Sequence, residues 1–299
     1  LRCGCDTTPA GPGFHKAALE LLEELGGLGI KEWKVQDRSD YQQDRDFEAL
    51  RREWFLPWLE EQVSQVLAET QPGEMGYLFW ETDQYRPEMV PDTIVTPLGR
   101  FPVAWLKEKL ENGGLEELAQ RLFLWDEPGM NAMYLRNRAL KQLWEDCCFA
   151  PSDRSYQDRQ GNADILDTLE RSASMDPSLP QPVAEYRELC ILDDREPNLP
   201  EDVPELEELC PIGYRKGEVL QPYDKLVVPL PGLYHYEWSN GGMDSAGAIC
   251  RDEESESPIW HFTALRSRMG SAQFGLDMAQ LQDVRTKQLE GGQAHWGWK

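Results

Sequence analysis

The sequence changes character at residues 193–208, and this change constrains the fold more than any other feature. The segment DDREPNLPEDVPELEE holds eight acidic residues, three prolines and one arginine. Because like charges repel and proline donates no backbone hydrogen bond, the segment is predicted to be a linker. Apolar residues recur at helical spacing before it, and short strand-like runs follow it. The sequence therefore predicts an α+β protein, with an α-rich domain at 1–200 and a small antiparallel sheet plus a C-terminal helix at 201–299.

The apolar pattern of the first domain predicts helices separated by turn-forming residues. Their expected ranges are 14–25, 47–67, 102–110, 115–124, 130–149, 163–175 and 182–192. Asp46 is expected to cap the second helix, and Pro57 is expected to kink or break it, because proline lacks the N–H that an inner helical turn needs. The apolar run 76–80 predicts a short strand that could pair with 93–96.

One helical hairpin has a more specific pattern. Residues 165–192, ILDTLERSASMDPSLPQPVAEYRELCIL, end a helix at an Asp-Pro turn and begin another helix a few residues later. This stretch resembles the helix–turn–helix junction of a tetratricopeptide repeat. The resemblance covers one hairpin, and no second copy follows at a period of about 34 residues, whereas stable arrays need about three repeats. We therefore expect a single helical hairpin within a larger α-rich domain.

The second domain is predicted to contain a sheet. Short strands are expected at 226–230, 233–238, 247–251 and 258–266, and the Asn240-Gly241 pair between two of them is a strong hairpin signal. Residues 271–289 carry apolar residues at helical spacing and predict the C-terminal helix.

Charge and cysteine content restrict the possible partners and compartment. The chain has 30 Lys and Arg residues against 54 Asp and Glu residues, which leaves a net charge of −24. A surface with this much negative charge repels phosphate backbones and anionic lipids. We therefore expect no direct binding to nucleic acid or membrane. Cysteine occurs seven times, an odd number, and no apolar signal segment is visible at the start. Reduced thiols and a cytoplasmic location are the predicted consequence.

Two histidines in the second domain are candidate metal ligands. Alternation along the strand 233–238 places His235 and Glu237 on the face opposite Tyr234 and Tyr236. His261 lies on a neighbouring predicted strand and converges with them if the register is suitable. Two imidazoles and a carboxylate can bind Zn²⁺ or Fe²⁺. The alternative is an ordinary half-buried sheet with polar residues facing water.

Other candidate sites rest on weaker patterns. The loop after the strand at 76–80 contains Asp83 and Tyr85, and together with Tyr234, Tyr236 and Glu237 these are the predicted binding residues, because aromatic side chains beside carboxylates suit a protein interface. The cysteine pairs at 3 and 5 and at 147 and 148 could hold a soft metal. However, neither pair has a partner at zinc-site spacing, and the second pair reads as small apolar residues on a helix.

The sequence lacks the common catalytic motifs. It has no phosphate-binding loop, no dinucleotide fingerprint, no nucleophile elbow and no His-Glu-x-x-His motif. We therefore expect no cofactor and a non-enzymatic protein that binds a basic protein partner, as an adaptor, inhibitor or immunity-type protein. Two alternatives stay open: a metal-dependent or acid–base hydrolase that uses the second-domain sheet, and an acidic mimic of nucleic acid.

Overall fold

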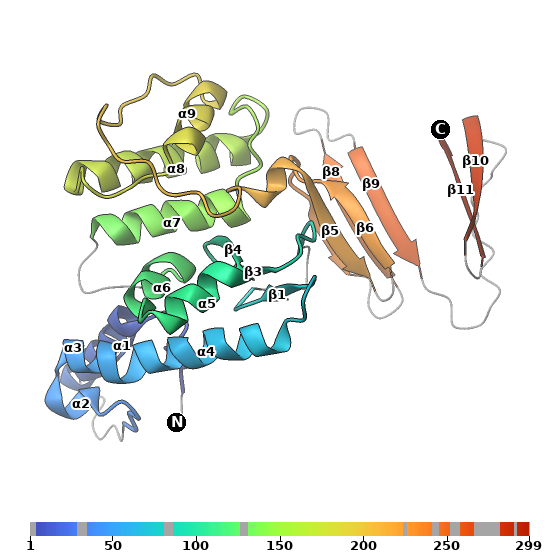
Figure 1. Cartoon of the computed structure of the whole chain (residues 1–299). Coiled ribbons are helices and arrows are strands. Elements are labelled where there is room, and N and C mark those ends of the chain that lie inside the picture. The colour runs from blue at the N-terminus through green and yellow to red at the C-terminus, as the bar shows by residue number, and fades with distance from the viewer. Residues whose placement is uncertain are drawn as a thin grey trace.

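The structure is a computed structural model that describes residues 4–28, 35–80, 86–125, 131–223, 226–240, 245–251, 258–265, 282–289 and 292–298. Side chains are described as far as Tyr236, with 222–226 excepted. The fold is α+β, as the sequence predicts, with helices concentrated in the first two-thirds and strands in the last third (Figure 1). Within these ranges, no helix combines the length and the apolar character that a membrane span requires.

Helical segments form the N-terminal end of the molecule: α1 (Pro12–Gly27), α2 (Tyr41–Asp44), α3 (Phe47–Leu50) and α4 (Leu56–Glu69). Asp46 caps α3, as predicted, by accepting a hydrogen bond of 2.9 Å from the Ala49 N–H. A single π-helical turn, η1 (Arg51–Phe55), joins α3 to α4 immediately before Pro57. Because Pro57 cannot donate to the preceding turn, the backbone changes its winding there. The predicted irregularity at Pro57 is confirmed.

A small sheet lies beside these helices. It consists of β1 (Met75–Tyr77), β3 (Thr93–Thr96) and β4 (Gly99–Pro102), in the order β1-β3-β4. The parallel pairing of β1 with β3 confirms the predicted partners. β1 ends earlier than predicted because Phe79 has a φ of 52°, which an extended strand does not allow. Helices α5 (Val103–Glu111) and α6 (Leu115–Leu122) follow β4 and share an apolar core with α1, α3 and α4.

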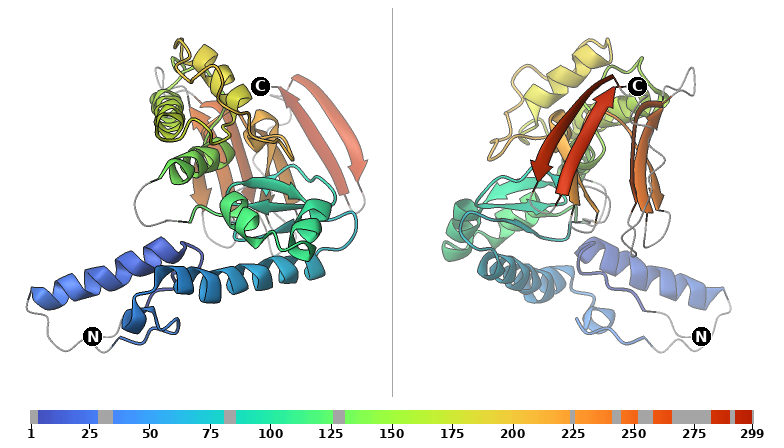
Figure 2. Two further views of the ribbon diagram at one scale, coloured as in Figure 1. Left: turned by 60° about the vertical axis from the view of Figure 1, so that its left-hand side comes forward. Right: turned by 90° about the vertical axis from the view of Figure 1, so that its right-hand side faces the viewer.

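A second helical unit lies at the opposite end of the molecule from α1 and α4 (Figure 2). It contains α7 (Ala132–Glu145), α8 (Tyr156–Met175) and α9 (Val183–Leu192), which surround a core of their own. Asn131 caps α7 by accepting the Tyr134 N–H at 2.8 Å. The α8–α9 hairpin turns at Asp176, whose carboxylate accepts the Ser178 N–H at 3.0 Å. The hairpin is thus confirmed, and its resemblance to a tetratricopeptide repeat stays a prediction.

Residues 193–208 are docked against this second unit. Gln181 donates its N–H to the Pro204 carbonyl oxygen at 2.9 Å and accepts the Leu206 N–H at 2.7 Å. Leu206 is 9% exposed and packs into the second core. Arg195 forms ion pairs with Asp167 and Glu170 of α8, so these opposite charges also hold the segment. The segment is therefore anchored rather than free, although the domain boundary near residue 200 stays a prediction.

A second sheet connects the two parts of the sequence. β2 (Arg86–Pro87), β5 (Glu218–Tyr223) and β6 (Leu226–Pro231) form it, and β2 pairs antiparallel with β5. The short helix η2 (Tyr214–Lys216) precedes β5. A third apolar core combines side chains from both sides of residue 200, namely Val95, Trp144, Tyr214, Val219 and Leu230. The two parts of the chain are thus packed together.

The remaining strands complete the C-terminal part. β7 (Glu237–Asn240), β8 (Ser245–Arg251) and β9 (Pro258–Leu265) form an antiparallel sheet, and β10 (Gln282–Leu289) pairs with β11 (Gly292–Trp298) as a separate hairpin. The antiparallel pairing of β7 with β8 confirms the predicted hairpin, of which Gly241 lies outside the described residues.

Two predictions for the C-terminal part are wrong. The strand expected over 233–238 begins only at Glu237, because the preceding residues form a loop. Of the terminal helix expected over 271–289, the structure describes only 282–289, and these residues form a strand, Gln282–Leu289. Val284 and Thr286 are β-branched and favour a strand. Gly292 lies opposite Leu289 in the next strand, and this pairing favours a hairpin over a helix.

Candidate metal centre

The corner between α7 and α8 supplies a buried thiol. The helix ends at Glu145, so Cys147 and Cys148 belong to the connection that follows it. Cys147 accepts the Phe149 N–H at 3.4 Å, and burial raises the pKa of its thiol to about 12. Cys148 is 3% exposed and faces a different set of neighbours, which includes His235. The two adjacent cysteines therefore occupy separate environments.

The first turn of α8 supplies a carboxylate held in one orientation. Ser155 is the N-cap, and its hydroxyl accepts the Asp158 N–H at 3.0 Å and donates to Asp158 Oδ2 at 2.6 Å. The serine hydroxyl thus caps the helix N-terminus and also fixes the carboxylate of the aspartate at the third helical position. Arg154 adds two hydrogen bonds, from Nε to Oδ2 at 2.8 Å and from Nη2 to Oδ1 at 2.9 Å. Asp158 is thus fixed although it is almost fully buried.

A loop between β6 and β7 supplies an imidazole. Arg215, which is buried, donates from Nε to the Gly232 carbonyl oxygen at 2.9 Å and from Nη2 to the Tyr234 carbonyl oxygen at 2.5 Å. These carbonyls therefore bond to a guanidinium rather than to a neighbouring strand, which explains why β7 begins later than predicted. Gly232 is required in this loop, since a Cβ would overlap the Arg215 backbone. The loop holds His235 beside the start of α8.

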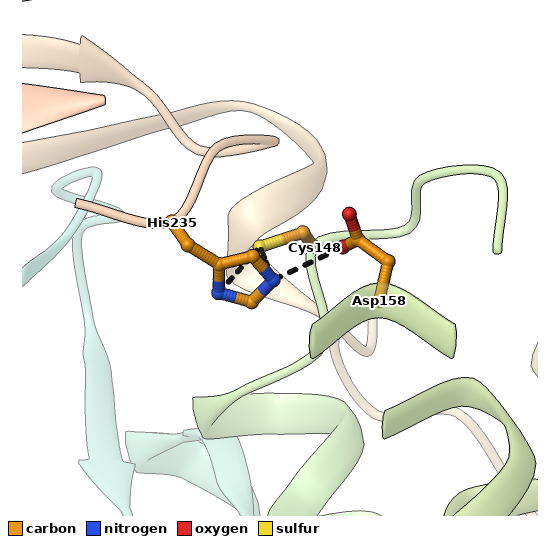
Figure 3. Close-up of side chains that lie close together, drawn as sticks. All are labelled: Cys148, Asp158 and His235. Carbon is orange, nitrogen blue, oxygen red and sulfur yellow. Dashed lines mark hydrogen bonds and ion pairs between the residues drawn. The ribbon is translucent and has the colours of Figure 1, made fainter. Parts of the chain in front are cut away.

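The three side chains point toward one another (Figure 3). His235 Nε2 lies 3.0 Å from Asp158 Oδ1 and 3.5 Å from Cys148 Sγ, and Nδ1 lies 3.7 Å from the same sulfur. One ligand atom from each residue lies within 4.8 Å of the other two. The side chain of His235 is 31% exposed, whereas that of Asp158 is 2% exposed. The cluster therefore lies beneath the surface with its imidazole partly open to solvent.

Hydrogen bonds shift the pKa values of two residues of the cluster in opposite directions. Burial acts to raise the pKa of Asp158, but hydrogen bonds from His235, Arg154 and Ser155 outweigh it and lower this pKa to about 2. Burial acts to lower the pKa of His235, but its hydrogen bonds with Asp158 and Cys148 raise the pKa to about 9. At neutral pH the carboxylate is ionised and the imidazole carries a proton. Without a metal ion, the cluster is thus an ion pair between protonated His235 and Asp158, with Arg154 bound to the same carboxylate.

The donor set fits a transition metal better than a hard cation. Thiolate, imidazole and carboxylate together suit Zn²⁺, whereas Mg²⁺ and Ca²⁺ prefer oxygen donors alone. Tetrahedral zinc bonds of about 2.0–2.3 Å place neighbouring ligand atoms about 3.3–3.7 Å apart, close to the 3.0 and 3.5 Å separations found here. The positive charge of Arg154, which is bound to Asp158, repels a metal cation at this site. A metal ion must also displace the proton on His235. The residues nevertheless fit zinc in type, and the two separations from His235 Nε2 fit it in spacing.

The structure describes the side chain of one predicted metal ligand, His235. Glu237 and His261 lie on β7 and β9, each opposite Ile249 of β8, so they share one level of the sheet. Their side chains lie outside the described part of the chain, and their convergence with His235 stays a prediction. The described ligand atoms around His235 come from Cys148 and Asp158 instead.

The structure describes the side chains of two predicted binding residues, Tyr234 and Tyr236. Asp83 and Tyr85 lie outside the described residues. The ring of Tyr234 lies under the Arg154 guanidinium, 5.3 Å from ring centroid to Cζ. Tyr236 packs beside the third core and donates its hydroxyl to the Pro231 carbonyl oxygen at 2.8 Å. Both described tyrosines are therefore partly engaged within the fold.

Sequence reasoning missed Asp158 and interpreted Cys148 as an apolar helix residue. The four residues from Ser155 to Asp158 do carry a local signal, because serine followed by an acid three positions later is the pattern of a helix N-terminus. Nothing local connects them to His235, which is 77 residues from Asp158 and 87 from Cys148. Only the tertiary fold brings the three together.

Comparison of this chain with protein-family models, with curated proteins and with solved structures finds no match. Its function is therefore argued from the site itself.

Proposed function

We propose that this protein binds a Zn²⁺-type transition-metal ion through Cys148, Asp158 and His235. The observation that carries the proposal is the convergence of one thiol, one carboxylate oxygen and one imidazole nitrogen within 4.8 Å. Each ligand belongs to a different segment, and each segment is held by its own hydrogen bonds. A preorganised set of three ligands is the arrangement that catalytic zinc sites use.

Neighbouring groups support the ligands as an outer shell. Arg154 and Ser155 both bind Oδ2 of Asp158, and Oδ1 is shared between His235 and Nη2 of Arg154. Hydrogen bonds of this kind fix the orientation of a metal-binding carboxylate. Arg215 performs the corresponding task for His235 by holding the backbone of its loop.

Three protein ligands leave one tetrahedral position for water. A zinc ion in such a site lowers the pKa of bound water toward 7 and makes hydroxide available as a nucleophile. The partly exposed imidazole places the centre near the surface, where a substrate can approach. The activity proposed for the protein is therefore metal-assisted hydrolysis.

Metal binding is tested on the full chain after chelator treatment and without a histidine tag. We expect one Zn²⁺ per chain, and we expect Cys148→Ser or His235→Gln to weaken binding about 100-fold or more, because loss of an outer-shell partner alone costs about 10–100-fold. Cys147→Ser is the matched control, since its buried thiol lies outside the cluster. Circular dichroism checks that each variant is folded. Failure of the wild-type chain to bind Zn²⁺ contradicts the proposal.

Hydrolysis is tested separately from binding. The zinc-loaded chain is assayed with generic ester, phosphodiester and peptide substrates, before and after chelation. The proposal expects hydrolysis of at least one class that chelation abolishes and Zn²⁺ restores in the wild type and in Cys147→Ser. Zinc binding without any hydrolysis restricts the centre to a structural role.

A second candidate function is the binding of a basic protein, which the net charge of −24 favours. Association between such partners is steered by long-range attraction, which salt screens over about 10 Å at 0.1 M. A partner captured from native lysate should therefore associate more slowly as ionic strength rises. An association rate that is independent of salt contradicts this candidate and leaves the charge as a contribution to solubility.

A further inference from the structure

Three arginines have no ion-pair partner within 4.0 Å among the described residues, and the acids that act on them, Glu88 on Arg100 and Glu117 and Glu207 on Arg121, do so at longer range. None of Arg100, Arg121 and Arg136 forms an ion pair with a described carboxylate, although other arginines of the chain do. Unpaired buried cations are costly, so arginines are usually paired where they leave water. Arg136 is buried and Arg100 and Arg121 are half-buried, so an anion supplied from outside the chain would offset their charges.

Two of these arginines line a surface pocket. It lies between the β3–β4 turn, α6, α7 and residues 206–212, and its polar lining includes Arg100 and Arg121. Arg100 donates one hydrogen bond of 3.2 Å, from Nη2 to the Glu88 carbonyl oxygen. Its buried Nε has no described acceptor, and its guanidinium lies 5.8 Å from the ring centroid of Trp144. Arg100 thus has a donor left over beside the pocket.

Arg121 adds a second guanidinium, whose hydrogen-bond acceptor is also uncharged. Its Nη2 donates to the backbone oxygen of Glu207 at 3.0 Å rather than to a carboxylate. Its guanidinium lies 5.9 Å from the ring centroid of Phe101, which also lines the pocket. Glu207 and Glu208 belong to the lining too, and their negative charges oppose an anion of high charge.

Arg136 lies near Arg121 and adds a third positive charge to this region. It is 4% exposed, and its Nε and Nη2 donate to the side-chain oxygen of Asn137 at 3.1 and 2.9 Å. Burial, followed by the nearby charge of Arg121, lowers the pKa of Arg136 to about 10. Arg136 is thus charged at neutral pH, and an anion near Arg121 would offset this repulsion.

We propose that this pocket binds one oxyanion group, a carboxylate or a phosphate, carried by a small molecule. The cavity volume of about 30 Å³ exceeds the roughly 10–15 Å³ needed for one water and suits a single oxyanion rather than a large ligand. The planar fork of arginine matches both groups. Since two glutamates also line the pocket, a singly charged carboxylate is the better fit. This site is independent of the proposed metal centre.

The probes are sodium acetate and sodium phosphate, compared with sodium chloride at equal ionic strength. Thermal unfolding of the full chain is followed as each anion is titrated. The proposal expects a saturable rise in the midpoint with acetate, phosphate or both, beyond that with chloride. Acetate acting more strongly than phosphate identifies the ligand group as carboxylate, and the reverse identifies it as phosphate.

The variants Arg100→Gln and Arg121→Gln should each weaken the apparent affinity about tenfold or more, because a hydrogen bond to a charged group contributes about 1.5–3 kcal/mol. Arg171→Gln on the exposed face of α8 is the matched control and should bind as the wild type does. If either glutamine variant unfolds, Arg→Lys at the same position keeps the charge but loses the fork, and should still bind more weakly. A midpoint that follows ionic strength alone, or equal binding by all variants, overturns the proposal.

Discussion

The substitution Leu206→Ala removes the side chain that anchors residues 193–208 to the second core. Leu206 is 9% exposed and packs among apolar residues of α7, α8 and α9. At about 0.8 kcal/mol for each buried carbon lost, the transfer contribution is about 2.4 kcal/mol. The residue lies at the edge of its core, where the chain can close part of the space, so the added cavity cost is small. We expect the free energy of unfolding to fall by about 2–3 kcal/mol.

Urea denaturation of the full chain measures this change, with Ile191→Ala as the control. Ile191 is 81% exposed on α9, so its truncation should change stability by less than about 0.5 kcal/mol. Limited proteolysis adds a second measurement: residues 193–208 should resist cleavage in the wild type and become sensitive in Leu206→Ala. The reasoning is refuted if a protease cuts the wild type first within 193–208 and both variants match its stability.

Three further predictions concern caps, backbone conformation and pH. Ser155→Ala removes the cap of α8 and should cost about 1 kcal/mol in urea denaturation; unchanged stability would mean that the cap contributes nothing. Gly213→Ala should cost about 2 kcal/mol or more, because Gly213 has a φ of 83° and a Cβ would overlap the Phe149 ring, whereas Gly217→Ala, with open space around it, should cost less. Equal losses at the two glycines would contradict this. Burial acts to raise the pKa of Asp37, but hydrogen bonds from Ser39 and Gln42 lower it overall. Its stabilisation should therefore be present above about pH 4 and be lost as pH falls through the lowered folded pKa. The difference in stability between wild type and Asp37→Asn should shrink over that range, and a constant difference would refute the assignment.

The helices could be predicted from the sequence because their signals are local. Asp46 and the apolar spacing that follows it report on a few turns of backbone, and Pro57 changes only the turn around it. The C-terminal helix was mispredicted over 282–289 because apolar spacing there suits a helix as well, while the pairing of β10 with β11 decides the outcome. Composition also misled at 193–208, where acids and prolines suggested a free segment and one buried leucine with two backbone hydrogen bonds anchors it.

The sequence predicts one of the three residues of the candidate site. The sequence pattern predicts His235 as a ligand, but on the premise that it lies on a strand whose alternation places it on the same face as Glu237. Arg215 instead binds the carbonyl oxygens of that loop, and His235 reaches Asp158. A long-range contact of this kind depends on how the β6–β7 loop packs on α8, which no periodicity in the sequence encodes.

The most direct test of the proposed metal centre is anomalous diffraction at the zinc absorption edge from crystals of the full chain grown with Zn²⁺. The proposal predicts one anomalous peak bonded to the cluster, about 2.3 Å from Cys148 Sγ and about 2.0–2.2 Å from His235 Nε2 and Asp158 Oδ1. The same peak should be present in Cys147→Ser and absent in Cys148→Ser. A cluster in which Asp158 keeps its hydrogen bonds to His235 and Arg154, with no anomalous peak beside the sulfur, would contradict the account.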